Sequence, residues 1–264
     1  MNLKNKTAII TGGGSGVGRA ICQTLGAQGM NVVALDLNLD GAKETVADLE
    51  NGLAIQTDIT NEEAVQKAFF QTLETFGTVD LLVNCAGVCV QKRLLDTTLK
   101  DWNIVQATNS TGTFLCSREA WKIMREQNSG HVINIASQAA GWPGANEVAY
   151  GTAKTAQLKF GLHLSDEMNL ENRIRANDGG TPGEWYSHII GPGAIDTPMN
   201  QQLGRKIPKD QLLTANDVAD LVLEVATHPA EGYSFFQTLE KPYHVGDTGW
   251  FSDWQQAMRI WQEK

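Results

Sequence analysis

Residues 7–18 read TAIITGGGSGVG, and this stretch decides the fold. Thr7 to Ile10 is a short apolar run that predicts a β-strand, and the glycine cluster follows it directly. From Val17 to Leu25 the apolar residues recur at helical spacing, and Gly29 stops the pattern. A glycine-rich turn lets backbone approach a phosphate group, and the helix after it offers free N–H groups and a partial positive charge. The stretch therefore predicts a strand, a phosphate-binding turn and a helix.

The spacing of the glycines fits the pattern G-x-x-x-G-x-G through Gly12, Gly16 and Gly18, and it does not fit G-x-G-x-x-G. A glycine-rich turn alone is weak evidence for a ligand. A strand before the turn and a helix after it form the setting that a dinucleotide pyrophosphate needs. The contacts expected from this turn are Gly12, Ser15, Gly16, Val17 and Gly18.

Asp36 ends the predicted second strand, 18 residues beyond Gly18. At that place a carboxylate accepts hydrogen bonds from the ribose hydroxyls of a dinucleotide and repels a 2′-phosphate. Leu37, the next residue, adds no positive charge that would hold such a phosphate. We therefore expect NAD rather than NADP as the cofactor.

Short apolar runs alternate with longer amphipathic segments along the chain, which is typical of βαβ units around a parallel sheet. No linker, repeat or low-complexity tract interrupts them. The expected fold class is α/β, a doubly wound parallel sheet (Rossmann fold) with helices on both faces, in a single domain over residues 1–264. The predicted strands cover 7–10, 31–36, 53–56, 79–84, 131–136, 187–190 and 243–245. The predicted helices begin near 17 and cover 40–50, a segment opened by a capping box from Thr60 to Glu63, 100–125, 150–170, and a segment capped at Thr214.

The chain is acidic, with 21 Lys and Arg against 30 Asp and Glu and a formal net charge of -9. Nucleic-acid binding needs basic patches, so we expect no nucleic-acid partner. The first residues lack the pattern of a signal peptide, and no uncharged apolar stretch reaches the roughly 18 residues of a membrane span. We therefore expect a cytoplasmic protein without membrane contact. The four cysteines form no Cys-x-x-Cys pair, which predicts buried free thiols and no metal site.

Tyr150 and Lys154 are spaced i and i+4 on a predicted helix, so their side chains share one face. A tyrosine hydroxyl is a poor base at neutral pH, but a neighbouring ammonium favours the phenolate and lowers its pKa. Ser137 directly follows the predicted strand 131–136, at the edge where open α/β sheets bind ligands, and its hydroxyl can bond a substrate oxygen. These residues predict a site that moves a proton to or from a substrate.

With these motifs in order, the chain resembles the short-chain dehydrogenase/reductase family over nearly its whole length. Thr11–Gly18 matches the family's cofactor loop, and Asp58 matches its adenine-contacting Asp. Asn84–Gly87 matches its Asn-Asn-Ala-Gly motif, with Cys85 in place of the second Asn. The remaining matches are Asn109, Ser137, Tyr150 and Lys154, and the segment Pro192–Gly193 with Ile195 and Thr197 that flanks the nicotinamide.

The resemblance implies hydride transfer between NAD(H) and a secondary alcohol or ketone. It implies that Tyr150 is the general acid/base and that Ser137 polarises the substrate oxygen. Lys154 is expected to lower the pKa of Tyr150 and to bind the nicotinamide ribose, while Asn109 anchors a proton relay. The implied cofactor contacts beyond the glycine turn are Asp36, Leu37, Asp58, Ile59, Asn84, Ala86, Gly87, Tyr150, Lys154, Pro192, Gly193, Ile195 and Thr197.

One segment departs from the family's pattern. Family members run from an Ile-Arg-Val-Asn stretch straight to Pro-Gly, whereas here residues 178–191 separate Ile174–Asn177 from Pro192. Either the strand is re-registered or a loop is inserted, and Trp185–Ile190 is the segment that can supply the strand. His188 then stands where the family has Asn, and we expect a packed or solvent-facing histidine rather than a catalytic base.

The substrate is less well defined than the cofactor. The short polar segment after Met199 favours a small polar substrate, such as a polyol or sugar, over a steroid. The alternatives are a 3-oxoacyl-thioester reductase, which usually draws on NADPH and so fits Asp36 less well, and a non-catalytic dinucleotide-sensing scaffold. The residues expected to line the substrate pocket are Trp142, Asn146, Glu147, Met199 and Gln202.

The C-terminal residues 251–264 carry four large apolar side chains at helical spacing. This predicts a helix that closes over a neighbouring subunit or the substrate pocket, or packs back onto its own domain. The resemblance to an often tetrameric family implies a homo-oligomer, either a tetramer or a dimer. The four apolar residues are Phe251, Trp254, Met258 and Trp261.

Overall fold

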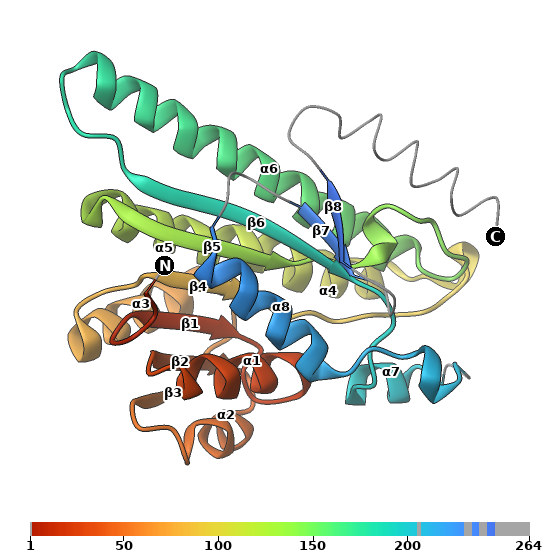
Figure 1. The fold of residues 1–264 in the computed structure, drawn as a ribbon. Coiled ribbons are helices and arrows are strands. Elements are labelled where there is room, and N and C mark those ends of the chain that lie inside the picture. The colour runs from red at the N-terminus through yellow and green to blue at the C-terminus, as the bar shows by residue number, and fades with distance from the viewer. Residues whose placement is uncertain (1, 205–206, 230–233, 238–241, 246–264) are drawn as a thin grey trace.

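The computed structural model describes residues 2–204, 207–229, 234–237 and 242–245 (Figure 1). Within them one sheet has the strand order β3-β2-β1-β4-β5-β6-β7-β8, in which every pair is parallel except β7 with β8. This confirms the predicted doubly wound fold. The strands are β1 (Thr7–Thr11), β2 (Asn31–Asp36), β3 (Gly52–Gln56), β4 (Leu81–Asn84), β5 (Ser129–Ile135), β6 (Glu184–Pro192), β7 (Ser234–Gln237) and β8 (Pro242–Val245).

Helices cover both faces of the sheet because neighbouring strand residues point to opposite sides. Ile10 packs in a core with α1, α2 and α8, whereas Ile9 packs in a second core with α3, α5 and α6. Both side chains are fully buried. The helices are α1 (Gly16–Ala27), α2 (Leu39–Val46), α3 (Glu62–Phe76), α4 (Leu99–Gln106), α5 (Gly112–Gln127), α6 (Val148–Asn177), α7 (Pro198–Gln202) and α8 (Ala215–Thr227).

The helix predicted over 100–125 is interrupted by one wide turn. A π-helical segment, Ala107–Thr111, joins α4 to α5 and carries Asn109. Such segments are rare and are frequent at functional sites. Periodicity predicted helical structure over this range but not the π-helical turn within it.

The extra residues 178–191, which separate Asn177 from Pro192 and depart from the family's pattern, are explained by a longer helix and a longer strand. α6 continues beyond the predicted end at Leu170 to Asn177 and takes up the Ile174–Asn177 stretch. β6 begins at Glu184, and its pairing with β5 runs through Ile135 and Ile190, so Trp185–Ile190 supplies the strand as expected. The end of α6 is fixed because the Arg175 guanidinium lies 4.6 Å from the Trp185 ring centre and donates to the carbonyl of Arg125.

Three local predictions were wrong. No capping box runs from Thr60 to Glu63, because Asn61 caps α3 by accepting from the N–H of Ala64, while the Thr60 hydroxyl donates to Asp58. α2 ends at Val46 rather than at residue 50. β7 has no counterpart among the predicted strands, since a four-residue run is too short for a periodicity argument.

Two further predictions concern the C-terminal tail and the membrane. The tail 251–264 lies outside the described residues. In the part of the chain that the structure describes, no helix combines the length and the apolar character that crossing a bilayer requires.

Candidate active site

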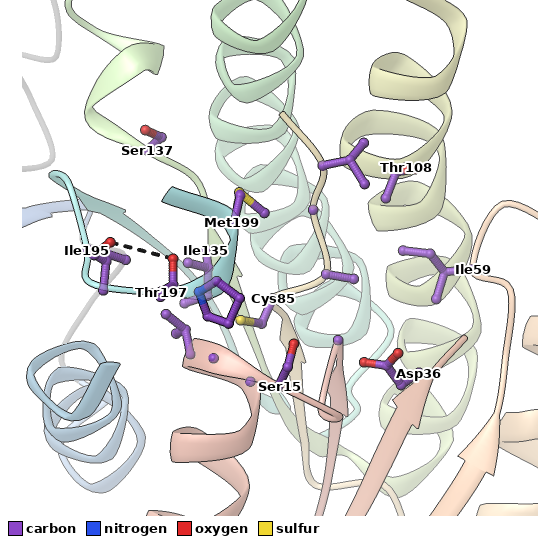
Figure 2. Close-up of a pocket in the computed structure, with 18 of the residues that line it drawn as sticks. Ser15, Asp36, Ile59, Cys85, Thr108, Ile135, Ser137, Ile195, Thr197 and Met199 are labelled. Carbon is purple, nitrogen blue, oxygen red and sulfur yellow. Dashed lines mark hydrogen bonds between the residues drawn. The ribbon is translucent and has the colours of Figure 1, made fainter. Parts of the chain in front are cut away.

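A cleft of about 360 Å³ runs along the carboxyl ends of the central strands, within the usual size range of ligand pockets. Figure 2 shows Asp36 at one end of this cleft and Ser137 at the other. Of the predicted cofactor contacts, only Asn84 does not line it. The predicted residues that line the cleft are Gly12, Ser15, Gly16, Val17, Gly18, Asp36, Leu37, Asp58, Ile59, Ala86, Gly87, Ser137, Tyr150, Lys154, Pro192, Gly193, Ile195 and Thr197.

The glycine turn has the geometry of an anion cradle. Gly12 and Gly16 have φ values of 70° and 50°, a region that favours glycine. An added Cβ at Gly18 would collide with the carbonyl oxygen of Gly12, so the turn closes tightly onto the start of α1. Ser15 precedes α1 without a side-chain cap, which leaves the first N–H groups of that helix for another acceptor. This arrangement fits a dinucleotide pyrophosphate.

Asp36 is held in a fixed orientation at the end of β2. Its Oδ2 accepts from the N–H of Gly14 at 2.9 Å, and its Oδ1 accepts from the N–H of Asn38 at 2.8 Å. Sequence reasoning missed Arg19, whose Nη2 donates to the Gly14 carbonyl at 2.7 Å and pairs with Glu44 at 3.1 Å. The Arg19 guanidinium is thus bound to protein acceptors, and Asp36 places a carboxylate at this end of the cleft.

Ser137, Tyr150 and Lys154 come together where β5 ends and α6 begins. The Ser137 and Tyr150 side chains both line the cleft and the cavity that adjoins it. Lys154 lies one turn further along α6, and its Nζ donates to the Ile135 carbonyl at 2.8 Å. The Nζ is 5.8 Å from the centre of the Tyr150 ring. The predicted i, i+4 pair therefore faces the cleft together with the predicted serine.

Burial dominates the ionisation of these groups. It raises the pKa of Tyr150 above its ordinary value, and the hydrogen bond from Ser137 opposes that rise. The structure therefore differs from the expectation that Lys154 sets the pKa of Tyr150. The pKa of Lys154 itself is lowered from 10.5 to about 8, because burial disfavours the charged ammonium.

Asn109 is buried behind the wall of the cleft, and its side chain uses its nitrogen but not its oxygen in hydrogen bonds. Its Nδ2 donates to the carbonyls of Val88 at 2.8 Å and Val105 at 2.9 Å. Its buried Oδ1 has no hydrogen-bond partner among the described residues. A Cβ added at Gly87 would lie 2.7 Å from this oxygen and 3.5 Å from Lys154 Nζ, so glycine keeps the space between the two atoms open. A bridging water would satisfy both groups.

A second cavity of about 290 Å³ adjoins the cleft at Ser137 and Tyr150. Of the side chains predicted to line a substrate pocket, Trp142, Glu147 and Met199 line it. Asn146 and Gln202 do not; both are exposed. Asn200, from the polar segment after Met199, also lines this cavity, and sequence reasoning missed Cys89, Gln138, Ala139, Ala194 and Leu203.

A family model described as short chain dehydrogenase matches residues 6–208. The chain belongs to the short-chain dehydrogenase family. A curated relative, the uncharacterized oxidoreductase YgcW of Escherichia coli K12, is 34% identical over 235 residues, which cover 88% of this chain and 89% of that protein. The chain also matches the longer uncharacterized oxidoreductase YuxG of Bacillus subtilis 168 at 35% identity over 65% of this chain, and it spans only 26% of that protein's length.

Two solved structures resemble this short-chain dehydrogenase. A short-chain dehydrogenase/reductase from Burkholderia phymatum in complex with NAD has 26% identity and a TM-score of 0.76, with 86% of this chain and 87% of that chain covered. A 3-ketoacyl-(acyl-carrier-protein) reductase from Brucella melitensis complexed with NADH has 26% identity and a TM-score of 0.77, with 85% and 91% covered.

Two residues that the family resemblance brought forward lie in the core of this short-chain dehydrogenase. Asn84 is buried beneath the cleft, where its Nδ2 donates to Ser117 at 2.8 Å and to Asn134 at 2.9 Å. Asn84 is the last residue of β4, and because its side chain is bonded to Ser117 and Asn134 in the core it does not line the cleft. His188 is buried beside His131, 2.6 Å away, and lines neither cavity, as expected for a packed histidine.

Some residues that line the cleft or the cavity belong to no motif from which the sequence could have predicted them. Cys85 and Thr108 line the cleft, and burial raises the pKa of the Cys85 thiol to about 12. Among the residues that the sequence analysis missed, Gln138 could have been predicted to line the cavity, because it directly follows the predicted site residue Ser137. No cluster of three or more metal-binding side chains exists among the residues that the structure describes.

The lowered pKa of Lys154 predicts a pH-dependent stability of the protein without cofactor. Between about pH 8 and pH 10.5 the unfolded state binds more protons than the folded state, so the free energy of unfolding rises with pH. Below pH 8 the penalty of burying the ammonium is fully present. From pH 7.5 to pH 10, the difference between the wild type and Lys154→Met in free energy of unfolding should rise by about 2 kcal/mol.

Urea titrations of both proteins at the two pH values measure this change. The buried cysteine thiols are common to both proteins, so their titration cancels in the difference. A difference that stays constant across this range would contradict the lowered pKa.

Proposed function

We propose that this NAD-dependent short-chain dehydrogenase transfers a hydride between NAD(H) and a secondary alcohol or ketone, with Tyr150 moving the proton. The observation that carries the proposal is the placement of Ser137 and Tyr150 together, because both side chains line the cleft and the adjoining cavity. A substrate oxygen in the cavity can meet both hydroxyls while its carbon faces the cleft.

The cleft residues fit NAD, which supplies the hydride-carrying nicotinamide when bound. The glycine turn from Gly12 to Gly18 would hold the pyrophosphate, and Asp36 would accept from the adenosine ribose. Lys154 would donate to the nicotinamide ribose, and Pro192 and Gly193 would lie beside the nicotinamide. The NAD and NADH complexes of the Burkholderia and Brucella proteins support this choice of cofactor.

The chain's own groups handle the proton. In the reduction direction the Tyr150 hydroxyl donates its proton to the substrate oxygen, while the Ser137 hydroxyl donates a hydrogen bond to the same oxygen. In the oxidation direction the Tyr150 phenolate accepts that proton. Because burial raises the pKa of Tyr150, alcohol oxidation should gain from alkaline assay conditions. The Oδ1 of Asn109, which has no hydrogen-bond partner among the described residues, would accept from a water that continues the proton path behind Lys154.

We propose a small polar substrate such as a polyol or sugar. The lining of the cavity supports this class, since Glu147, Gln138 and Asn200 offer hydrogen-bonding groups beyond the reacting oxygen. The Glu147 carboxylate is itself anchored, because its Oε1 accepts from Gln91 at 2.8 Å. A polyol hydroxyl is a donor that such a carboxylate can accept.

A 3-oxoacyl-thioester substrate is the second candidate. The likeness to the Brucella 3-ketoacyl-(acyl-carrier-protein) reductase favours it. That enzyme was solved with NADH, so the preference of Asp36 for NAD does not separate the two substrate classes. A non-catalytic sensing role is the third reading, and the Ser137, Tyr150 and Lys154 geometry argues against it.

We further propose a homo-oligomer, a dimer or a tetramer, built by the single domain. Large apolar side chains at the surface near α4 and α5 support this assembly, since monomers rarely leave such surface uncovered. The molar mass from light scattering tests it. The exposed side chains are Leu94, Leu95, Leu99, Ile104 and Phe114.

A substrate screen tests the proposed function. The purified protein is incubated with NAD and sugars, polyols or cyclic alcohols at alkaline pH, or with NADH and 3-oxoacyl thioesters at neutral pH, and NADH absorbance is followed. We expect turnover with a polyol or sugar. Turnover with the thioester alone would select the second candidate, and turnover with none would support the sensing role.

A further inference from the structure

Gln157 is a buried amide on the face of α6 that carries Lys154. Gln157 is 1% exposed and Lys154 is 3% exposed. The Oε1 of Gln157 accepts from Lys154 Nζ at 2.8 Å, and its Nε2 donates to the Thr113 hydroxyl at 3.0 Å. A buried amide costs free energy unless its polar atoms are paired, and here both are.

The contacts of Gln157 extend from α6 to α5. Thr113 in α5 donates to the carbonyl of Asn109 at 2.9 Å, within the π-helical turn. Three hydrogen bonds in series thus lead from the ammonium of Lys154 to the turn that carries the unused Asn109 oxygen. This connection joins the two helices that hold the proposed proton path.

The contact with Gln157 restricts how the Lys154 ammonium can rotate. An ammonium has three N–H groups, and the Ile135 carbonyl and Gln157 Oε1 accept from two of them. These two acceptors fix the rotation of the ammonium. With two N–H groups bound, the direction of the third is set. Because Lys154 lines the cleft, this third N–H is the one that a ligand in the cleft can accept from.

We propose that Gln157 is a positioning residue that orients the Lys154 ammonium toward the cleft and links it through Thr113 to the turn of Asn109. The inference rests on the proposed function, in which Lys154 binds the nicotinamide ribose. An apolar side chain at position 157 would fill the same core space but would offer no acceptor to Lys154.

The titratable groups that face Lys154 are few. Tyr150 lies on the same helix, and Cys85 and Cys89 approach from the segment after β4. Gln157 is neutral and adds no charge to this set. Replacing it with glutamate would place a carboxylate near the ammonium and favour its charged form, whereas leucine would leave a buried N–H unpaired and disfavour that form.

The experiment uses Gln157→Glu and Gln157→Leu, with Thr113→Val as the matched control at the far end of the connection. Protein labelled with ¹³C at the lysine side chains is titrated without cofactor, and the signal that Lys154→Met removes reports the pKa of Lys154. We expect the glutamate variant to raise this pKa by about one unit or more, and the leucine variant to lower it by a similar amount. Thr113→Val should shift it less than either.

The leucine variant should also raise the Kd for NAD by about 10-fold or more, since a hydrogen bond to a charged group is worth about 1.5–3 kcal/mol. If the leucine variant fails to fold, the nearly isosteric glutamate variant still decides. An unchanged pKa of Lys154 in the folded glutamate variant would overturn the inference and leave the proposed activity intact. An active Tyr150→Phe variant would overturn the proposed function and leave the Gln157 result intact.

Discussion

Tyr150→Phe is expected to reduce turnover by about 100- to 10,000-fold, the range that general acid/base catalysis contributes. The substitution removes only the hydroxyl that transfers the proton, so the ring still packs against Lys154. NADH binding, measured by fluorescence titration, should therefore stay close to that of the wild type. A variant that keeps more than about a tenth of the wild-type turnover would show that Tyr150 does not handle the proton.

The matched control is Tyr186→Phe. Tyr186 lies in β6 beside the histidine pair and lines neither cavity. Its hydroxyl has no place in the proposed reaction, so turnover should stay within about twofold of the wild type, a barrier change below about 0.5 kcal/mol. A loss of activity in both variants would point to a general effect of removing a tyrosine hydroxyl.

NAD is expected to exceed NADP in kcat/KM by at least about tenfold, because 1.4 kcal/mol of repulsion already gives that factor. Asp36 is fixed by the N–H groups of Gly14 and Asn38, so its carboxylate cannot easily turn away from a 2′-phosphate. Asp36→Ser should reduce the preference by improving the use of NADP. Kinetics with both coenzymes at several concentrations measure the ratio.

Glu44→Gln serves as the control for this preference. It removes the ion pair of Arg19 but leaves Asp36 in place, and Glu44 does not line the cleft. We expect this variant to keep the preference for NAD. Equal catalytic efficiency of the wild type with the two coenzymes would contradict the role of Asp36.

The parts of the fold that could be predicted are those in which burial forces a simple pattern. β1 and β2 are buried along their central residues, and these residues form continuous apolar runs that mark the two strands in the sequence. The glycine turn could be predicted because Gly12 and Gly16 adopt backbone angles that favour glycine. The spacing of these two glycines in the sequence therefore predicts where the backbone turns.

The features that escaped prediction depend on contacts between distant segments. Gln157 is an ordinary polar residue in the sequence, and only the packing of α6 against α5 makes it a partner of Lys154. The continuation of α6 to Asn177 depends on Arg175 and Trp185, which meet only in the folded chain. The pKa of Tyr150 depends on how deeply the site is buried, which an i, i+4 spacing does not reveal.

The most direct test of the proposed reaction follows the hydride itself. The best alcohol from the screen is prepared with deuterium on the carbinol carbon and incubated with NAD and either the wild type or Tyr150→Phe. The mass of the reduced nicotinamide cofactor is then measured. Direct hydride transfer predicts that the wild type yields NADH one mass unit heavier, as labelled cofactor, and that the variant yields little reduced cofactor of either mass. Reduced cofactor without deuterium, or equal formation of labelled cofactor by Tyr150→Phe, would contradict the proposed reaction.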